Sequence, residues 1–580
     1  MFVYMIDSKF TNDGGGYLMK IKEKKTPLVF FGILFFSIQS LVFVIQYKIN
    51  YPYSMDYLAT DYIIDFLQSG EFSWEQLVQP HAGHHLIFPR LIAIPNLLLN
   101  SFDVGNFFIF QWVFFSVALL LIYLILKKTD QRLIWLMIPI SAFIYSPLQS
   151  SNYWAFAIWL WLIPPIAIMG IIHLLNNQKI NYKIFSFAIV LAIISTFSSI
   201  IGVIAWIPGL IMILTKNQSK KWFVIWVISV AVVGGVYYSS VPHNDVKTTP
   251  ELVFTPEGYG FIATFVAVAF RLKYDILMDI VGTFSIILSA IMLWYFIKIK
   301  KVQAVIPWIM FLVIGITSAI ITGMGRIYLD FHIGNEPYYI PVAHFTQIGL
   351  LVLISIIILE LKNKKKENHK IISATLFTII IVFSIMLIPS YVAGWNRGEI
   401  YFEEKNKFLE CFMLSSNIKC TEDGGVFKKD LDFENINYLL ENDLSIFGER
   451  NFNESNLNEL AEFKVNLQNK ELQKYFGGME LMNKQNIDEK NKFNISEPIV
   501  IFEGNGETLA NHKFDEIIIL LNSEPFLKSE EFYEKNSESD SKFRISFLSG
   551  YFPKGCYELE LIGVSKGEIF SNEKIYQVCK

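Results

Sequence analysis

The sequence predicts an α-helical polytopic membrane domain of about eleven spans, followed by a soluble α+β or β-sandwich-like C-terminal domain. Apolar runs of about 18 residues or more recur as far as Tyr391, and about 20 helical residues cross the hydrocarbon core of a bilayer. From Asn396 onward Glu, Lys, Asn and Asp dominate, and the apolar runs are short and rich in β-branched residues. The chain is 53% hydrophobic, which exceeds the share usual in soluble domains.

We expect three regions: a cytoplasmic N-terminus (1–26), a transmembrane domain (27–395) with a long outer loop (48–106), and a soluble extracytoplasmic domain (396–580). The first apolar run begins near Pro27 and is too long for the apolar region of a cleavable signal, so we interpret it as a signal anchor. The predicted spans lie near 27–47, 107–126, 133–147, 154–175, 183–197, 199–215, 222–240, 277–298, 303–322, 339–361 and 371–391.

The positions of Lys and Arg orient these spans in the cell (plasma) membrane. Cytoplasmic connections carry an excess of basic residues. With the N-terminus in the cytoplasm, every basic cluster falls on the cytoplasmic side, and the opposite orientation places all of them outside. An odd number of spans then puts the C-terminal domain outside. The basic clusters lie at 20–25, 127–132, 179–183, 216–221, 298–301 and 362–370.

The four cysteines fit this orientation, because all of them lie in the predicted exported domain. An oxidising compartment permits two disulfide bridges. We favour the pairs Cys411–Cys420 and Cys556–Cys579, although four cysteines permit three pairings. Four unpaired thiols are the alternative.

Unusual polar residues collect in the predicted outer connections, whereas the inner connections are short and basic. The loop 48–106 contains an apolar stretch with two prolines that is short for a span, so we expect a helix at the membrane interface. Later outer connections carry SPLQSSNYW (146–154) and the polar segments 241–260 and 323–345. Because a charge inserted at mid-bilayer costs about 2.5–3.5 kcal/mol, this distribution indicates a site on one membrane face. The loop 48–106 holds Asp56, Asp61, Asp65, His81, His84, His85 and Arg90.

This arrangement resembles the GT-C membrane glycosyltransferases, which include the protein O-mannosyltransferases and the aminoarabinose transferases. Those enzymes have an acidic residue soon after the first helix, a long outer loop with interfacial helices and, in many members, a soluble outer domain. The sequence is similar in particular to a group of bacterial members of this type. The matching segments are Asp56, GEFSWEQL (70–77), AGHHLIFPR (82–90), SPLQSSNYW (146–154), FSSIIGVIAW (197–206) and the Gly-Arg pair 325–326.

The sequence departs from that group at three positions. Gly83 and His85 stand where the group has the Glu and Arg of an N-E-H-R pattern, and EPYY (336–339) replaces a later S-R-Y. These departures keep open a catalytically inactive relative that acts as a scaffold.

The resemblance implies transfer of a sugar from a polyprenyl-phosphate donor to a glycan, lipid or protein acceptor on the outer face. It implies that Asp56 is the general base, which takes the proton of the acceptor hydroxyl. A surface or capping carboxylate is the alternative for Asp56. Arg90 and Arg326 are candidates for binding the donor phosphate, because guanidinium donates paired hydrogen bonds to phosphate oxygens. Snorkelling at a helix end is the alternative for both arginines. Arg271 and Lys273 are further candidates of this kind.

Five side chains are candidates for contacting the substrates: His84, His85, Gln149, Asn152 and Asp61. Hydrogen bonding inside the loop is the alternative for the histidines, and helix capping is the alternative for Gln149 and Asn152. The H-x-x-H-H spacing does not match a closed zinc pattern, so we predict no cofactor, with a divalent metal as the open alternative.

Two other classes of protein were weighed. A formal net charge of −4 without a basic patch argues against nucleic acid as a partner. A transporter or flippase of a lipid-linked saccharide predicts ionisable residues within the spans and an inverted repeat, whereas the predicted spans are nearly free of charge. The C-terminal domain is predicted to be a structural cap, with carbohydrate binding as the alternative.

Overall fold

The structure is a computed structural model of the chain. It describes residues 16–48, 63–64, 66–71, 73–80, 84–100, 103–149, 162–177, 180–215, 219–241, 249–272, 274–328, 334–362 and 367–415, together with eleven strands between residues 473 and 579. The predicted residues Asp56, Asp61, Asp65, His81, Asn152, Lys273 and Cys420 lie outside these ranges.

The described chain contains seven helices that are long and apolar enough to cross a membrane, which makes this a multi-pass helical membrane protein. These helices are α1 (Gly16–Tyr47), α5 (Asn106–Thr129), α11 (Lys220–Ser240), α13 (Asp275–Lys298), α14 (Val302–Arg326), α15 (Ile340–Lys362) and α16 (Glu367–Ser415). Helix α15 lies at the centre, because 89% of its apolar window is buried, whereas α1 and α11 expose most of theirs. All seven coincide with predicted spans.

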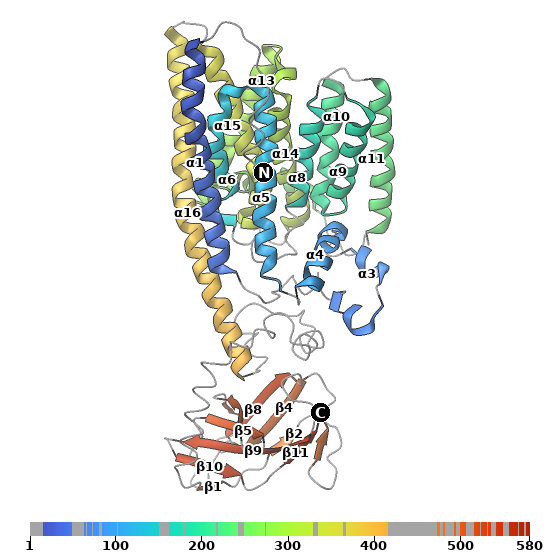
Figure 1. Ribbon diagram of the computed structural model, residues 1–580, viewed down its shortest axis with the longest axis vertical. Helices are drawn as coiled ribbons and strands as arrows, with labels where there is room; N and C mark the ends of the chain where they lie inside the picture. The colour runs from blue at the N-terminus through green and yellow to red at the C-terminus, as the bar shows by residue number, and fades with distance from the viewer. Residues whose placement is uncertain are drawn as a thin grey trace.

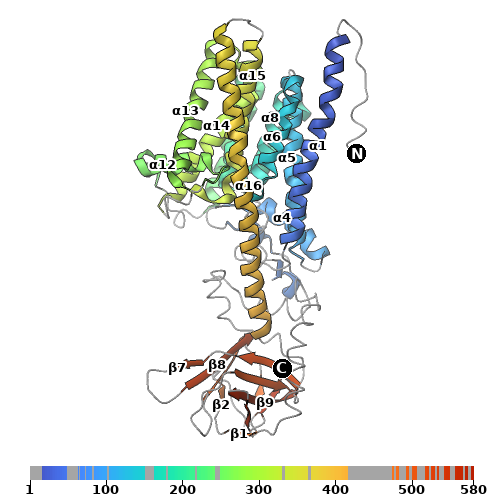
Figure 2. The same ribbon diagram turned by 90° about the vertical axis from the view of Figure 1, so that its left-hand side faces the viewer.

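The other four predicted spans fall on shorter helical segments that run beside the long ones (Figures 1 and 2). Three of them include a 3-10 segment or a proline near the helix start. The number eleven therefore stays a prediction, and the seven long helices are its confirmed part. The shorter segments are η2 (Gln131–Leu136) with α6 (Met137–Ile144), α8 (Ile163–Leu175), α9 (Tyr182–Thr196), and η5 (Ile200–Ala205) with α10 (Trp206–Thr215).

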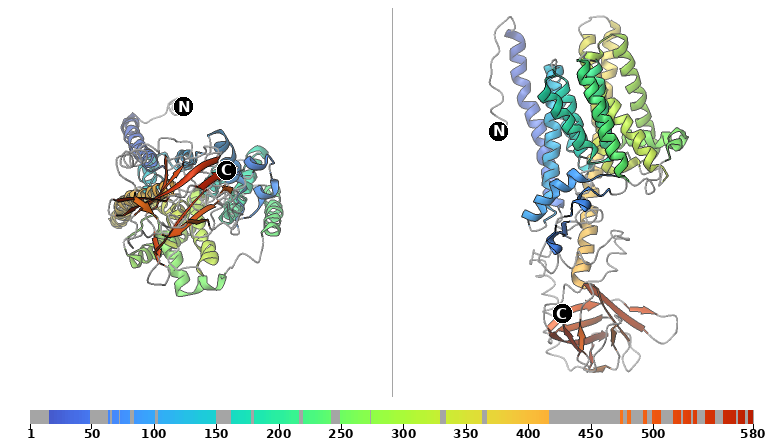
Figure 3. Two further views of the ribbon diagram at one scale, coloured as in Figure 1. Left: turned by 90° about the horizontal axis from the view of Figure 1, so that it is seen from below. Right: turned by 90° about the vertical axis from the view of Figure 1, so that its right-hand side faces the viewer.

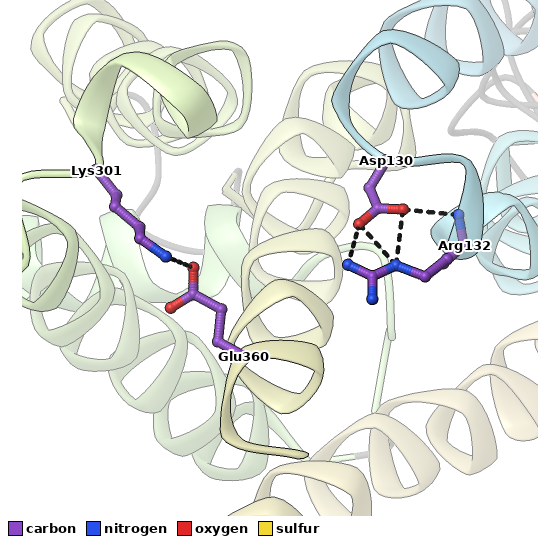
Figure 4. Close-up of polar contacts among 4 residues, drawn as sticks. All are labelled: Asp130, Arg132, Lys301 and Glu360. Carbon is purple, nitrogen blue, oxygen red and sulfur yellow. Dashed lines mark hydrogen bonds and ion pairs between the residues drawn. The ribbon is translucent and has the colours of Figure 1, made fainter. Parts of the chain in front are cut away.

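Helix α5 carries Lys127 and Lys128 in its last turn, α13 ends with Lys298, and α11 begins with Lys220 and Lys221. Figure 1 shows these helix ends on the side of the bundle where α1 begins. Both ion pairs found in the described chain lie there: Lys301 with Glu360 at 2.8 Å, and Arg132 with Asp130 at 2.7 Å (Figure 4). Further hydrogen bonds join helices at this end, from Trp308 Nε1 to Thr129 Oγ1 (3.0 Å), from Gln303 Nε2 to Thr215 O (2.7 Å) and from Lys128 Nζ to Asn177 Oδ1 (3.0 Å). We call this the basic end.

The opposite end carries the connections that the sequence predicts to be outside, and we call it the polar-loop end. Here lie α3 (Trp74–Val78), α4 (Ile87–Leu99), η3 (Pro147–Gln149), η6 (Pro250–Phe254), α12 (Pro256–Ala267) and η8 (Pro337–Tyr339). Helix α4 is the short helix predicted in the first loop. Helix α16 runs beyond the bundle at this end toward the strands (Figures 1 and 2), and α3 and α4 lie between the bundle and the strands (Figure 3). Which end faces the cytoplasm stays a prediction.

The C-terminal strands form two sheets. One contains β1 (Gln473–Tyr475), β3 (Lys492–Asn494), β5 (Glu516–Leu521), β6 (Glu524–Ser529), β9 (Cys556–Ser565), β10 (Glu568–Asn572) and β11 (Tyr576–Cys579). The other contains β2 (Met479–Leu481), β4 (Ile499–Asn505), β7 (Phe532–Glu534) and β8 (Ser541–Leu548). The sandwich arrangement stays a prediction.

The register of β9 and β11 bears on one predicted disulfide. Cys556 lies directly opposite Cys579 across this antiparallel pair. Opposite residues in such a pair have Cα atoms about 4.5–5.5 Å apart, which is within the range of a disulfide. The register is therefore compatible with the predicted bridge. The other predicted pair joins Cys411, in α16, to Cys420, so it is not described.

Two glycines allow α16 to approach its neighbours closely. A Cβ atom at Gly394 would meet backbone atoms of Leu148 and Pro147 in η3, and one at Gly398 would meet the rings of Phe43 and Tyr47 in α1. Glycines four residues apart are a common way for membrane helices to pack backbone against backbone. This contact joins the first and last spans and seats η3 between them.

We predict that Gly394→Ala destabilises the protein by about 1–3 kcal/mol, because a new methyl group cannot displace the η3 backbone at low cost. Gly234→Ala in α11 is the matched control, since a Cβ there meets nothing within 4 Å. It should leave stability unchanged or raise it slightly. Thermal unfolding in detergent measures both variants, and equal midpoints would contradict the close contact.

We predict opposite accessibility for cysteines placed at the two ends of the bundle. Trp74 in α3 and Tyr182 in α9 are 70% and 67% exposed. A membrane-impermeant maleimide should label Trp74→Cys in intact cells and Tyr182→Cys only after permeabilisation, each measured above the labelling of the native cysteines. The reverse pattern would overturn the predicted orientation.

Candidate functional site

Three arginines from different elements lie around the segment 335–339 at the polar-loop end. Arg271 follows α12, Arg326 is the last residue of α14, and Arg397 lies in α16. We call Arg271, Arg326 and Arg397 the arginine cluster. Among the described residues, none of the three forms an ion pair with a carboxylate, unlike the basic side chains paired at the other end.

Arg271 is held in an unfavourable backbone conformation beside this segment. Its φ of 33° is unusual for a residue that has a side chain. Its Nη1 donates a hydrogen bond to Asn335 O at 3.2 Å. Burial lowers the pKa of the Arg271 guanidinium, and the nearby charge of Arg397 lowers it further, against the opposing effects of Glu336 and Asp275. Arg271 and Arg397 thus affect each other electrostatically.

Arg397 supplies a buried donor to the cluster. Its Nη1 atom is buried and has no hydrogen-bond partner among the described residues. The side chain leaves α16 between Gly394 and Gly398, where the helix contacts η3 and α1. A buried N–H group of a cation without an acceptor is costly, so this position favours an anionic ligand that accepts its hydrogen bond.

Arg326 lies on the other side of the same segment. It is half-buried, and its charge acts on Tyr338 and Tyr339 in η8. Glu336 acts on the same two tyrosines and on Arg271. The segment 335–339 is thus linked to Arg271 and Arg326, and Arg397 joins the group through its effect on Arg271. Phosphate is the kind of group that several arginines bind together.

Gln149 lies close to the cluster but directs its amide group into the protein. It is fully buried, its Nε2 donates to Ile144 O at 2.8 Å, and its Oε1 has no hydrogen-bond partner. The donor therefore caps the carbonyl end of α6, and a role of Gln149 in substrate binding stays a prediction. Because η3 contacts α16 at Gly394, Gln149 also lies near the helix that carries Arg397.

The histidines of the first loop lie in a different part of the polar-loop end. His84 Nδ1 accepts a hydrogen bond from Ile200 N at 3.2 Å, and Ile87 N donates to Phe197 O at 3.1 Å. The described part of the loop motif, residues 84–90, is thus docked on the motif 197–206. Figure 1 shows α3 and α4 below α9, α10 and α11, on the side of the bundle away from α16.

His85 connects this loop to α11. Its Nδ1 donates to Val78 O at 3.2 Å, and its Nε2 pairs with Ser240 Oγ at 2.7 Å. The ring lies edge-on to Phe197 and Tyr237. Burial lowers the pKa of His85, and the charge of Arg90 lowers it further, against the hydrogen bond to Val78. The imidazole is therefore neutral near pH 7.

Arg90 holds α3 in place. Its Nη1 donates to the carbonyl oxygens of Gln76 (2.9 Å), Leu77 (2.9 Å) and Gln79 (2.7 Å), and the residue is only 5% exposed. A cation at the C-terminal carbonyls of a helix also complements its dipole. These contacts give Arg90 a structural role, so its phosphate-binding role stays a prediction.

A cavity of about 1560 Å³ lies next to His85. One wall is polar and comes from the segment around α3, whereas the other is apolar and comes from the ends of α9 and α11. Arg90 is not among the described residues that line it. The polar wall includes Glu71, Glu75, Gln76 and Gln79, and the apolar wall includes Ile193, Phe197 and Val236.

The sequence analysis did not name two of the residues that the structure singles out. Arg397 lies at the end of the last apolar run, in the pattern GWNRG (394–398). An arginine flanked by glycines in a helix was the sequence feature that could have indicated this residue. His344 lies inside α15, fully buried, with neither ring nitrogen hydrogen-bonded and its ring edge-on to Phe143 at 5.5 Å. A single histidine in a long apolar run gives no such signal. No group of three or more metal-ligating side chains occurs among the described residues.

Comparisons of the chain with protein-family models, curated proteins and solved structures find no match.

We predict that Arg90→Met loosens α3 without unfolding the bundle. Hydrogen bonds from a charged donor are worth about 1.5–3 kcal/mol, so amide hydrogen exchange in residues 74–79 should become roughly 10- to 100-fold faster. Arg132→Met at the basic end is the matched control, because the Arg132 side chain is 58% exposed and paired only locally. Unchanged exchange in Arg90→Met would show that the three carbonyl contacts do not hold α3.

Proposed function

We propose that the chain is a membrane glycosyltransferase that moves a sugar from a polyprenyl-phosphate donor to an envelope glycan, lipid or protein acceptor at the polar-loop end. The arginine cluster is the observation that carries this proposal. Among the described residues, these three cations have no carboxylate partner and one buried donor of Arg397 has no acceptor, and they lie where apolar helices end. A phosphate on a lipid tail suits both the arginines and the apolar helix ends. Its oxygens accept the hydrogen bonds of the arginines, and its tail remains among the helices.

In this proposal the cluster binds the donor phosphate, and Asp56 is the general base. The acceptor hydroxyl oxygen attacks the anomeric carbon of the donor, the bond from that carbon to the phosphate oxygen breaks, and polyprenyl phosphate leaves. Asp56 takes the proton of the hydroxyl. The arginines stabilise the charge that develops on the departing phosphate. The GT-C resemblance of the sequence supports the role of Asp56, which lies outside the described residues.

A transporter or flippase of a lipid-linked saccharide is the second candidate. His344 favours it, because a buried ionisable residue within a span is typical of a substrate or proton pathway. A catalytically inactive scaffold is the third, and the departures at Gly83 and His85 favour that candidate.

The activity test follows the lipid carrier, so it requires no knowledge of which sugar is transferred. In proteoliposomes that contain the cell's own lipid extract, the wild type should convert sugar-loaded polyprenyl phosphate into free polyprenyl phosphate, measured by mass spectrometry. Asp56→Asn should slow this by about 10²–10⁴-fold, because the base is lost. Arg397→Gln should slow it by about 10²-fold, because one phosphate donor is lost. Arg132→Gln at the basic end is the control and should retain wild-type turnover.

A binding test separates the site from the reaction. Native mass spectrometry should show farnesyl phosphate bound to the wild type and at least tenfold weaker binding to Arg397→Gln, whereas farnesol should bind poorly to both. Full turnover by Asp56→Asn would remove the proposed mechanism. Equal binding of farnesol and farnesyl phosphate would remove the proposed phosphate site.

A further inference from the structure

The cavity beside His85 lies apart from the arginine cluster and has the structure of an amphiphile site. It opens between the segment 68–80 and the ends of α9 and α11. These elements lie on the side of the bundle away from α16, which carries Arg397 (Figures 1 and 3). Its volume of about 1560 Å³ exceeds the roughly 300–1,000 Å³ of an ordinary small-molecule pocket, so it has room for more than one sugar ring.

The polar wall of the cavity selects against anions. The charged side chains among its described lining residues are Glu71 and Glu75, and no Lys or Arg accompanies them there. Gln76 and Gln79 add amide groups, and Ser69 and Ser73 add hydroxyl groups. These side chains can accept hydrogen bonds from hydroxyl groups and donate hydrogen bonds to them. The carboxylates repel a phosphate or a carboxylate.

The apolar wall continues along the outside of the bundle. Val236 lines the cavity and is also 52% exposed. It is the last member of a stripe at four-residue spacing on α11, with Val224, Ile228 and Val232 exposed by 51%, 56% and 59%. Residues four apart share one helix face, so this stripe runs from the cavity along the surface that faces the bilayer.

We propose that this cavity binds the headgroup of an uncharged, hydroxyl-rich amphiphile, a glycolipid, whose chain lies along the exposed stripe 224–236 of α11. The carboxylates and amides of the segment 71–79 bind the sugar hydroxyls, and Phe88 and Phe197 supply apolar surface at the cavity wall. The neutral His85 joins the two walls through its bonds to Val78 and Ser240. The binding site does not depend on the proposed glycosyltransferase reaction.

The test measures binding of dodecyl glucoside to the protein in phosphatidylcholine nanodiscs by native mass spectrometry, with dodecyl phosphate as the anionic comparison. We expect saturable binding of one glucoside and at least tenfold weaker binding of the phosphate to this site. Val236→Trp fills the cavity mouth and should weaken glucoside binding at least tenfold. Val227→Trp is the matched control, because Val227 lies on the opposite face of α11, is 43% exposed and does not line the cavity.

A second variant keeps the test decisive if Val236→Trp does not fold. Glu71→Gln combined with Glu75→Gln changes two exposed side chains, and it should weaken glucoside binding about tenfold while leaving the thermal midpoint unchanged. Equal binding of the glucoside and the phosphate, or equal glucoside binding by the Val236 and Val227 variants, would overturn the proposal. Arg397→Gln should bind the glucoside as the wild type does, so failure of the phosphate site and failure of this one are distinguishable.

Discussion

The cost of placing charge in hydrocarbon governs the arrangement of this protein. A bilayer offers no water to charged groups, so ionisable side chains move to the ends of the helices unless a partner holds them inside. The two ends meet this constraint differently. At the basic end, Lys301 and Arg132 are paired with carboxylates. At the polar-loop end, the arginine cluster has no such pairing among the described residues.

The proposed phosphate site lies at the polar-loop end, where the described arginines lack carboxylate partners. Salt-bridged cations at the basic end are already compensated, and Arg90 is likewise engaged by the carbonyl groups of α3. The charge of Arg397 instead lowers the pKa of Arg271, and a buried donor of Arg397 has no acceptor among the described residues. The described part of the polar-loop end therefore has two regions of opposite character: a cationic one that includes Arg271, Arg326 and Arg397, and an acidic one beside His85, lined by Glu71 and Glu75.

The packing of short segments brings these regions about. The first loop docks through main-chain and histidine hydrogen bonds onto the segment after α9, and His85 ties it to α11. On the other side, Gly394 lets α16 contact η3 so closely that Arg397 lies beside the loop that carries Gln149. Small residues and neutral polar side chains thus set the positions of the charged groups.

The sequence by itself predicted the membrane class, eleven spans of which seven are long helices in the structure, and the basic residues at one end of those helices. The length of an apolar span and the free-energy cost of a charge within it depend on local sequence. These features could therefore be predicted without knowledge of the tertiary structure. The tertiary structure decided which polar residues meet. It tied Arg90 and His85 to the segment around α3, and it brought Arg397, which the sequence did not single out, near Arg271. Such groupings depend on how helices that are far apart in the sequence pack together. The sequence of each span by itself does not specify that packing.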